Sequence, residues 1–211
     1  MDPSQPVVSC WFGGVPDLPT ACLRNHNFKA DLHGFQQKFN RDPVMAVNEL
    51  TNQDPRLRQH SSIAQLLFYT PGISPSAVSN YAFSSSIDSS SFLHFYFSSI
   101  DLEFLSLDEA ARFLLSKISL FNSADKTETI LKSFSKVYLI NNSYQPLTVN
   151  DVYKLTLGLI VNSISRYKGI PVSPVFQKVF NTVNIAERCR VQILNSLNER
   201  PLPLFFVFGD V

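Results

Sequence analysis

Four histidines and three cysteines are the side chains of this sequence best suited to hold a metal ion or to attack a substrate. Metal-binding histidines on one helix usually lie four residues apart, and metal-binding cysteines usually occur as CxxC pairs. None of the seven has such a partner. They are His26, His33, His60, His94, Cys10, Cys22 and Cys189. We therefore expect neither a metal site nor a cofactor, and the unpaired thiols predict a reducing, cytoplasmic compartment.

The acidic residues that lie close together in the sequence form two pairs, Asp101 with Glu103 and Asp108 with Glu109. Both precede or begin an apolar helical pattern, where negative charge interacts favourably with the helix dipole. No G-x-S-x-G elbow and no glycine-rich phosphate loop occurs. A hydrolase or nucleotide-binding site of a common kind is therefore not expected.

The composition indicates a protein with one large core. The chain has 211 residues, 45% of them apolar, and its 18 basic residues nearly balance 17 acidic ones. A chain of this length and apolar content can bury a full core, and the absence of a basic block argues against nucleic acid as a partner. The longest apolar stretches, 155–161 and 202–208, are much shorter than the roughly 20 residues of a transmembrane helix. No transmembrane segment is predicted.

The hydrophobic pattern after residue 28 is helical, and residues 1–27 form a Pro/Gly-rich arm. Helix starts are expected near Pro43, Ser61–Ser62, Ser74–Pro75, Ser89–Ser91 and Thr148, and further helices over 175–183 and 191–197. No convincing strand alternation is present. We predict an all-α domain of about ten helices over 28–201, followed by an apolar tail, 202–211. Such a tail is expected to dock on its own domain or on neighbouring sequence, which suggests a piece of a larger multi-domain protein.

Residues 107–138 contain two amphipathic helices joined by a short break at 120–123. This stretch, together with FNRDP, SSIAQLLFYTPGISPSAVSNY and FLHFYFSSIDLEFLSLDEAARFLLSKISL before and within it, resembles the Sec-seven domain of guanine nucleotide exchange factors for Arf GTPases. The resemblance is closest to the large, brefeldin-inhibited branch and covers residues 28–201. It implies a right-handed superhelix of about ten α-helices, with a hydrophobic groove between two motifs that binds the GTPase.

The first family motif reads Phe-Arg-Leu-Pro-Gly-Glu-Ala-Gln-Lys-Ile, and residues 118–127 of this chain read ISLFNSADKT. Leu120, Ala124 and Lys126 match. Phe121-Asn122 replaces the Pro-Gly turn, and Ser123 stands where the family has its glutamate. Phe121, a large aromatic residue at a loop tip, is expected either to plug the groove from within or to anchor a partner.

The second family motif reads Met-Leu-Asn-Thr-Asp-Leu-His, and residues 160–166 read IVNSISR. Asn162 is retained, Ser163 is a conservative change, and Ile164 replaces the aspartate. Taken together, the two motifs give the candidate residues for a GTPase groove: Leu120, Phe121, Asn122, Ser123, Ala124, Lys126, Asn162, Ile164, Arg166 and Tyr167.

The serine at position 123 determines the functional prediction. The resemblance implies that the family glutamate brings a negative charge to the phosphate and Mg²⁺ site of the GTPase. One charge pair at about 4 Å is worth roughly 4 kcal/mol at an effective dielectric near 20, or about a thousandfold in rate. A neutral serine cannot supply this energy. Asp125 and Glu128 lie about 200° and 140° around the helix from Ser123, so neither is expected to replace the glutamate.

Three functions remain compatible with these residues. The favoured one is a degenerate exchange domain that acts as a regulatory or protein-interaction module in Arf signalling and vesicle traffic, without exchange activity. The second is an active exchange factor for an Arf-family GTPase that works without the glutamate. The third is a helical scaffold that binds no GTPase. By the resemblance, the protein is expected on Golgi, endosomal or vesicle membranes as a peripheral component.

Overall fold

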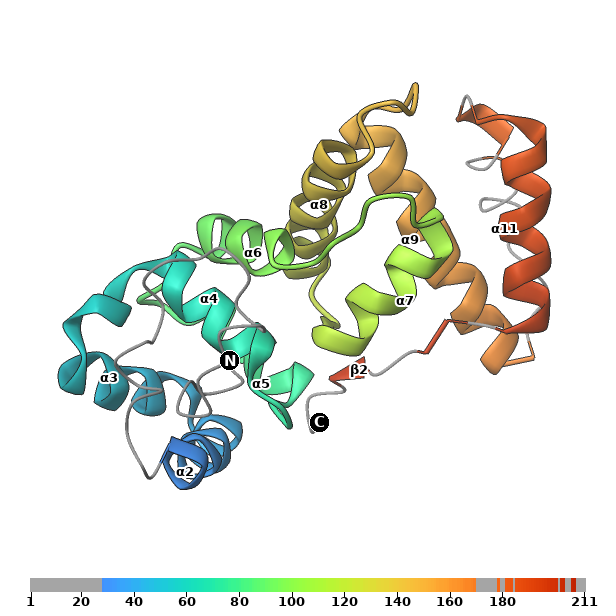
Figure 1. Ribbon diagram of the computed structural model, residues 1–211. Helices are drawn as coiled ribbons and strands as arrows, with labels where there is room; N and C mark the ends of the chain where they lie inside the picture. The colour runs from blue at the N-terminus through green and yellow to red at the C-terminus, as the bar shows by residue number, and fades with distance from the viewer. Residues whose placement is uncertain are drawn as a thin grey trace, which may run out of the picture.

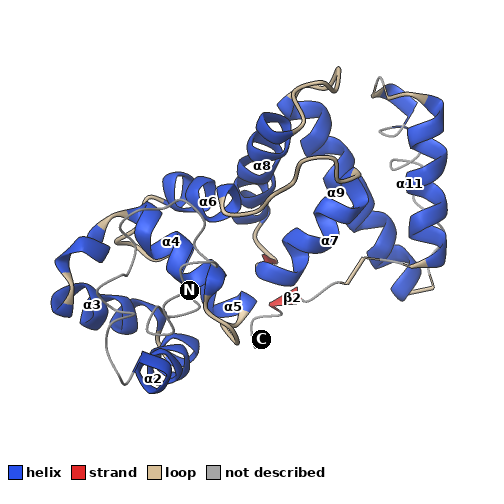
Figure 2. Ribbon diagram, in the orientation of Figure 1, coloured by secondary structure: helices blue, strands red, loops and turns tan. Residues whose placement is uncertain are grey.

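The computed structural model describes residues 28–169, 178, 181–183, 185–200, 202, 203, 206 and 207. Within these residues the elements are α2 (Phe28–Arg41), α3 (Pro43–Gln53), the 3-10 helix η2 (Pro55–Arg58), α4 (His60–Tyr69), α5 (Pro75–Ala82), α6 (Ser89–Ser98), α7 (Leu107–Lys117), β1 (Leu120–Phe121), α8 (Ala124–Asn141), α9 (Val149–Tyr167), α11 (Glu187–Glu199) and β2 (Phe206–Val207). The expected arm at 1–27 lies outside the described residues, as does most of the helix expected at 175–183. Helices dominate the described part (Figure 2), so the all-α class is confirmed.

Local capping residues set several of the helix starts. Asp42 Oδ1 accepts a hydrogen bond from the Met45 N–H at 3.0 Å, and Pro43 occupies the first turn of α3, where its missing N–H costs nothing. Thr148 and Asp151 form a reciprocal capping box at the start of α9, with distances of 3.0 and 3.2 Å. Hydrogen bonds from Thr148 lower the pKa of Asp151. These starts agree with the sequence predictions.

Two helix starts differ in detail from the prediction: α4 begins one residue early, and α6 begins at Ser89, as expected, but with a different cap. Helix α4 begins at His60 after Gln59, and not at Ser61–Ser62. Asp88, rather than one of the following serines, caps α6 and accepts hydrogen bonds from the N–H groups of Ser90 and Ser91. In both places several polar residues in a row can begin a helix, so the sequence alone does not choose among them.

The helices pack mainly on their neighbours and form an elongated stack (Figure 1). At one end α2, α3 and α5 lie together; α4 packs on α6, α6 on α8, and α8 on α9. Helix α7 packs on α9, and α11 covers α7 at the other end. None of the described helices is both long and apolar enough to cross a bilayer.

A row of aromatic rings runs through the core from α2 to α8. Adjacent centroids lie 5.2–6.2 Å apart, the usual range for packed aromatic pairs. The rings are all at most 4% exposed. In order they are Phe39, Tyr81, Phe92, Tyr96, Phe97, Phe134 and Tyr138. The row fixes α8 against α6 and thereby sets the position of the α8 N-terminus.

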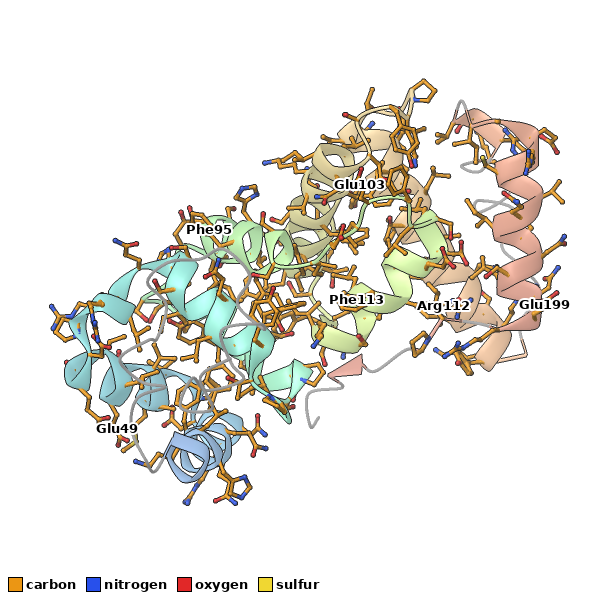
Figure 3. The ribbon with its side chains drawn as sticks, viewed as in Figure 1. Glu49, Phe95, Glu103, Arg112, Phe113 and Glu199 are labelled. Atoms are coloured by element: carbon orange, nitrogen blue, oxygen red, sulfur yellow. The ribbon has the colours of Figure 1, made fainter. Side chains whose placement is uncertain are left out.

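We expect Phe134→Ala to lower the free energy of unfolding by about 3–5 kcal/mol, because it removes a fully buried ring and leaves a cavity. Phe95→Ala is the matched control, since Phe95 on α6 is 40% exposed (Figure 3) and should cost well under half as much. Urea unfolding of both variants measures the difference. Equal losses of unfolding free energy in the two variants would show that the aromatic row does not stabilise the core more than an exposed ring does.

Candidate functional site

The segment between α7 and α8 changes from buried to exposed along its length. Ile118, Ser119 and Leu120 are buried, Phe121 is half-buried, and residues 122–125 are exposed. We call residues 122–125 the tip. The fold therefore holds the start of this segment firmly and presents its end to solvent.

The end of α7 is held before the segment begins. The Lys117 ammonium lies 4.7 Å from the ring centroid of Phe68 and 5.9 Å from that of Phe113. Figure 3 labels Phe113 on α7. The hydroxyl of Tyr96 donates to the Lys117 carbonyl oxygen at 3.1 Å. Burial lowers the pKa of Lys117, while the ring faces favour its charged form. These contacts fix the direction in which the chain leaves α7.

A buried serine on α5 then clamps the backbone of Ser119. Ser79 Oγ donates to the Ser119 carbonyl oxygen at 2.7 Å and accepts from the Ser119 N–H at 3.0 Å. Both residues are buried, so each of these groups would be costly to leave unpaired. The clamp joins residues 40 positions apart and places Leu120 in the core.

Phe121 packs on its own domain. Its ring meets that of Phe83 edge to face at 5.2 Å, and the Lys126 ammonium lies 4.7 Å from the Phe121 centroid. Thr127 Oγ1 donates to the Phe121 carbonyl oxygen at 2.9 Å. Of the two roles expected for Phe121, these contacts correspond to packing within its own domain. The exposed part of the ring still borders the tip.

Ser123 is the N-cap of α8. Its backbone is extended, with φ −79° and ψ 123°, and its side chain makes no capping hydrogen bond. The residue is exposed. A side chain at this position therefore leads into solvent at the positive end of an 18-residue helix.

Two carboxylates follow Ser123 in the first turns of α8. Asp125 is exposed in the first turn. Glu128 Oε1 is 2.5 Å from the Lys132 ammonium, so its charge is compensated within the helix. Neither carboxylate occupies the N-cap position of Ser123.

The second set of candidate residues lies on α9, and one of them, Arg166, contacts α11. Arg166 Nη1 donates to the Leu197 carbonyl oxygen at 3.1 Å, and Nη2 to Asn198 Oδ1. Asn162 is 2% exposed, and none of the described residues forms a hydrogen bond with its Oδ1. Ile164 is half-buried, whereas Tyr167 is 61% exposed. Asn162 is thus buried and Arg166 is bonded to α11, unlike the exposed residues of the tip.

The residues that the sequence analysis missed are those that hold the segment. Ser79 and Phe83 come from α5 and its end, and Thr127 from α8. The strands β1 and β2 were also missed: they pair in parallel, with Leu120 opposite Phe206 and Phe121 opposite Val207. The apolar tail was the available signal for this pairing, because it was expected to dock on its own domain. Two-residue strands show no alternation that could be recognised.

The described residues contain no cluster of three or more histidine, cysteine or acidic side chains that could hold a metal ion.

Comparison with known protein families identifies the scaffold. The family model of the Sec7 domain matches residues 28–181, which is most of the helical part of the chain. The chain belongs to the Sec7 domain family. This is the family that the two motifs resemble, and Ser123 lies in the Sec7 segment between α7 and α8. Comparison with curated protein sequences gives no match.

Solved Sec7 structures have the same fold. The Sec7p catalytic domain superposes with a TM-score of 0.72 at 19% identity, over 81% of this chain and 97% of that one. A Sec7 domain in complex with ARF1-GDP and Brefeldin A gives 0.69 at 19% identity, over 85% and 98%. The N-terminal Sec7 domain of RalF gives 0.69 at 17% identity, over 89% and 98%. A chimera that carries the Sec7 domain of Legionella pneumophila RalF gives 0.71 at 18% identity, over 88% and 57%.

Ser79→Ala tests the clamp on the Sec7 segment. We expect a loss of about 1–3 kcal/mol in unfolding free energy, because the buried carbonyl of Ser119 loses the Ser79 hydroxyl. The Ser119 N–H keeps only its longer bond to the Pro75 carbonyl oxygen at 3.3 Å. Faster hydrogen exchange at the Ser119 amide should accompany the loss. Ser135→Ala is the control, since this buried hydroxyl bonds only the Leu131 carbonyl of its own helix. Unchanged exchange at Ser119 would refute the clamp.

Proposed function

We propose that this Sec7 domain binds an Arf-family GTPase, or another protein, through the tip and the adjoining Phe121 and Lys126, without accelerating nucleotide exchange. These residues are called the loop surface below. The observation that carries the proposal is the exposed Ser123 at the N-cap of α8, in the place of the family glutamate. The domain acts as a regulatory or interaction module in Arf signalling.

The exposure of the tip supports a binding role. Residues 122–125 are all exposed while the segment before them is clamped in the core, so the surface is presented without being loose. The solved complex of a Sec7 domain with ARF1-GDP supports a GTPase as the partner class. A preorganised surface binds with less loss of conformational entropy.

The lack of a carboxylate that could replace the family glutamate supports the absence of nucleotide exchange activity. A neutral hydroxyl at position 123 forgoes an interaction worth up to about 4 kcal/mol. Glu128 is compensated by Lys132, and Asp125 lies two residues further along the helix, so it projects from a different face. Neither residue is therefore a substitute, which favours a binding module over an active exchange factor.

The wider setting follows from the resemblance to the large branch of the family. We place the domain in a larger multi-domain protein that acts in vesicle traffic, as a peripheral component of Golgi, endosomal or vesicle membranes. The domain would then recruit or retain a GTPase rather than activate it.

Ser123→Glu restores the missing charge and provides the test. Release of a fluorescent nucleotide is measured on a panel of Arf-family GTPases. We expect the wild-type chain to leave nucleotide release at its intrinsic rate. Ser123→Glu should raise the release rate by about tenfold or more. The increase should stay below the roughly thousandfold that the charge alone could supply, because the Pro-Gly turn is also missing. Ser143→Glu adds the same charge about 27 Å away, beyond the other end of α8, and should have no effect.

Three outcomes separate the alternatives. Wild-type catalysis comparable to that of an active Sec7 domain would refute the proposal in favour of an exchange factor that works without the glutamate. Failure of both forms to retain a nucleotide-free GTPase would favour a scaffold that binds none. Retention without any gain from Ser123→Glu would point to Ile164 and the second motif.

A further inference from the structure

After α11, the described residues of the chain are bonded to α7 at Arg200, to α9 at Leu202 and to β1 at Phe206–Val207. We call these described residues, Arg200, Leu202, Pro203, Phe206 and Val207, the C-terminal strap; β2 forms its end (Figure 1). Arg112 on α7 donates to the carbonyl oxygen of Arg200 (Figure 3). The strap is therefore bonded to α7, the helix that precedes the Sec7 segment in the sequence.

Leu202 is the point at which the strap is attached to α9. Its side chain is fully buried. Its N–H donates to Ser163 Oγ at 3.2 Å, and its carbonyl oxygen accepts from the Tyr167 hydroxyl at 3.2 Å. Both backbone groups of Leu202 are thus bonded to side chains of the second motif region.

The other end of the strap is attached directly in front of the tip. Phe206 and Val207 pair in parallel with Leu120 and Phe121, and Asn122 follows at once. In the family this place is a Pro-Gly turn, which restricts the backbone by itself. Here Phe121-Asn122 supplies no such restriction, and pairing with the strap supplies it instead.

The docked strap leaves the tip uncovered. Residues 122–125 are exposed, and Tyr167 is 61% exposed, with the strap in place. A segment that blocked this surface would bury these residues. The arrangement therefore positions the tip rather than hiding it.

We infer that the C-terminal strap is a positioning element of the loop surface, so that docking of the strap and binding of a protein partner at the tip favour each other. This inference rests on the proposed function only in one respect, the identity of the partner. Because coupling between two binding events is reciprocal, a bound partner also stabilises the docked strap. The residues that transmit the coupling are Ser163, Leu202, Leu120 and Phe121.

Ser163→Ala loosens the strap without touching the loop surface. Ser163 is fully buried, so a partner cannot contact it, and the change leaves the Leu202 N–H without its acceptor. We expect faster hydrogen exchange at the Leu202 amide and at the Thr127 amide, which donates to the Ser123 carbonyl oxygen of the tip at 3.1 Å. We also expect the affinity for nucleotide-free Arf-family GTPase to fall by about two- to tenfold, as for the loss of one hydrogen bond. Ser135→Ala, a buried serine with a bond inside α8, should change neither.

Hydrogen exchange at the tip tests the inference independently of any GTPase. If the Leu202 amide opens and hydrogen exchange at the Thr127 amide, which is bonded to the Ser123 carbonyl, stays unchanged, the strap does not position the tip. An increase in GTPase affinity would show that the strap competes with the partner, which also overturns the inference. If no GTPase binds the wild-type chain, the proposed function fails while the exchange data still test the strap. Should Ser163→Ala not fold, Tyr167→Phe removes the other bond to Leu202 and keeps the ring; this variant is judged by hydrogen exchange alone, because Tyr167 is exposed and could itself contact the partner.

Discussion

The buried aromatic row from Phe39 to Tyr138 is the interaction on which the rest of the structure depends. It links α2, α5, α6 and α8 through edge-to-face and tilted ring contacts, and its members are almost entirely shielded from water. Because Phe134 and Tyr138 anchor α8, the row also fixes where that helix begins. Ser123 at this N-terminus owes its position to side chains far from it in sequence.

The sequence predicted the parts of the fold that local signals encode. The starts of α3 and α9 follow from Asp42-Pro43 and from the Thr148–Asp151 box, and the all-α class follows from the helical periodicity. The clamp of Ser79 on Ser119 could not be predicted, because nothing near Ser79 indicates a partner 40 residues away. The same holds for the pairing of β1 with β2, in which two residues on each side are too few to show a period.

The candidate residues of the site remain a prediction, and the structure places them in two different environments. Ser123 and its neighbours are exposed, as a partner-binding loop requires. On α9, by contrast, Asn162 is buried and the Arg166 guanidinium is bonded to α11. The Sec7 scaffold thus presents Ser123 and its neighbours in an exposed loop between α7 and α8. Clamping by Ser79, packing against Phe83 and pairing with the strap hold this loop in place, which is consistent with a surface kept for binding.

The most direct test of binding at the loop surface is a hydrogen-exchange footprint of the chain with an excess of nucleotide-free Arf-family GTPase. Our account predicts slower exchange in peptides that cover residues 120–126 and in the strap at Leu202, with little change at the far end of α8 around Tyr144. Protection confined to other surfaces, with residues 120–126 unchanged in a complex that forms, would contradict it.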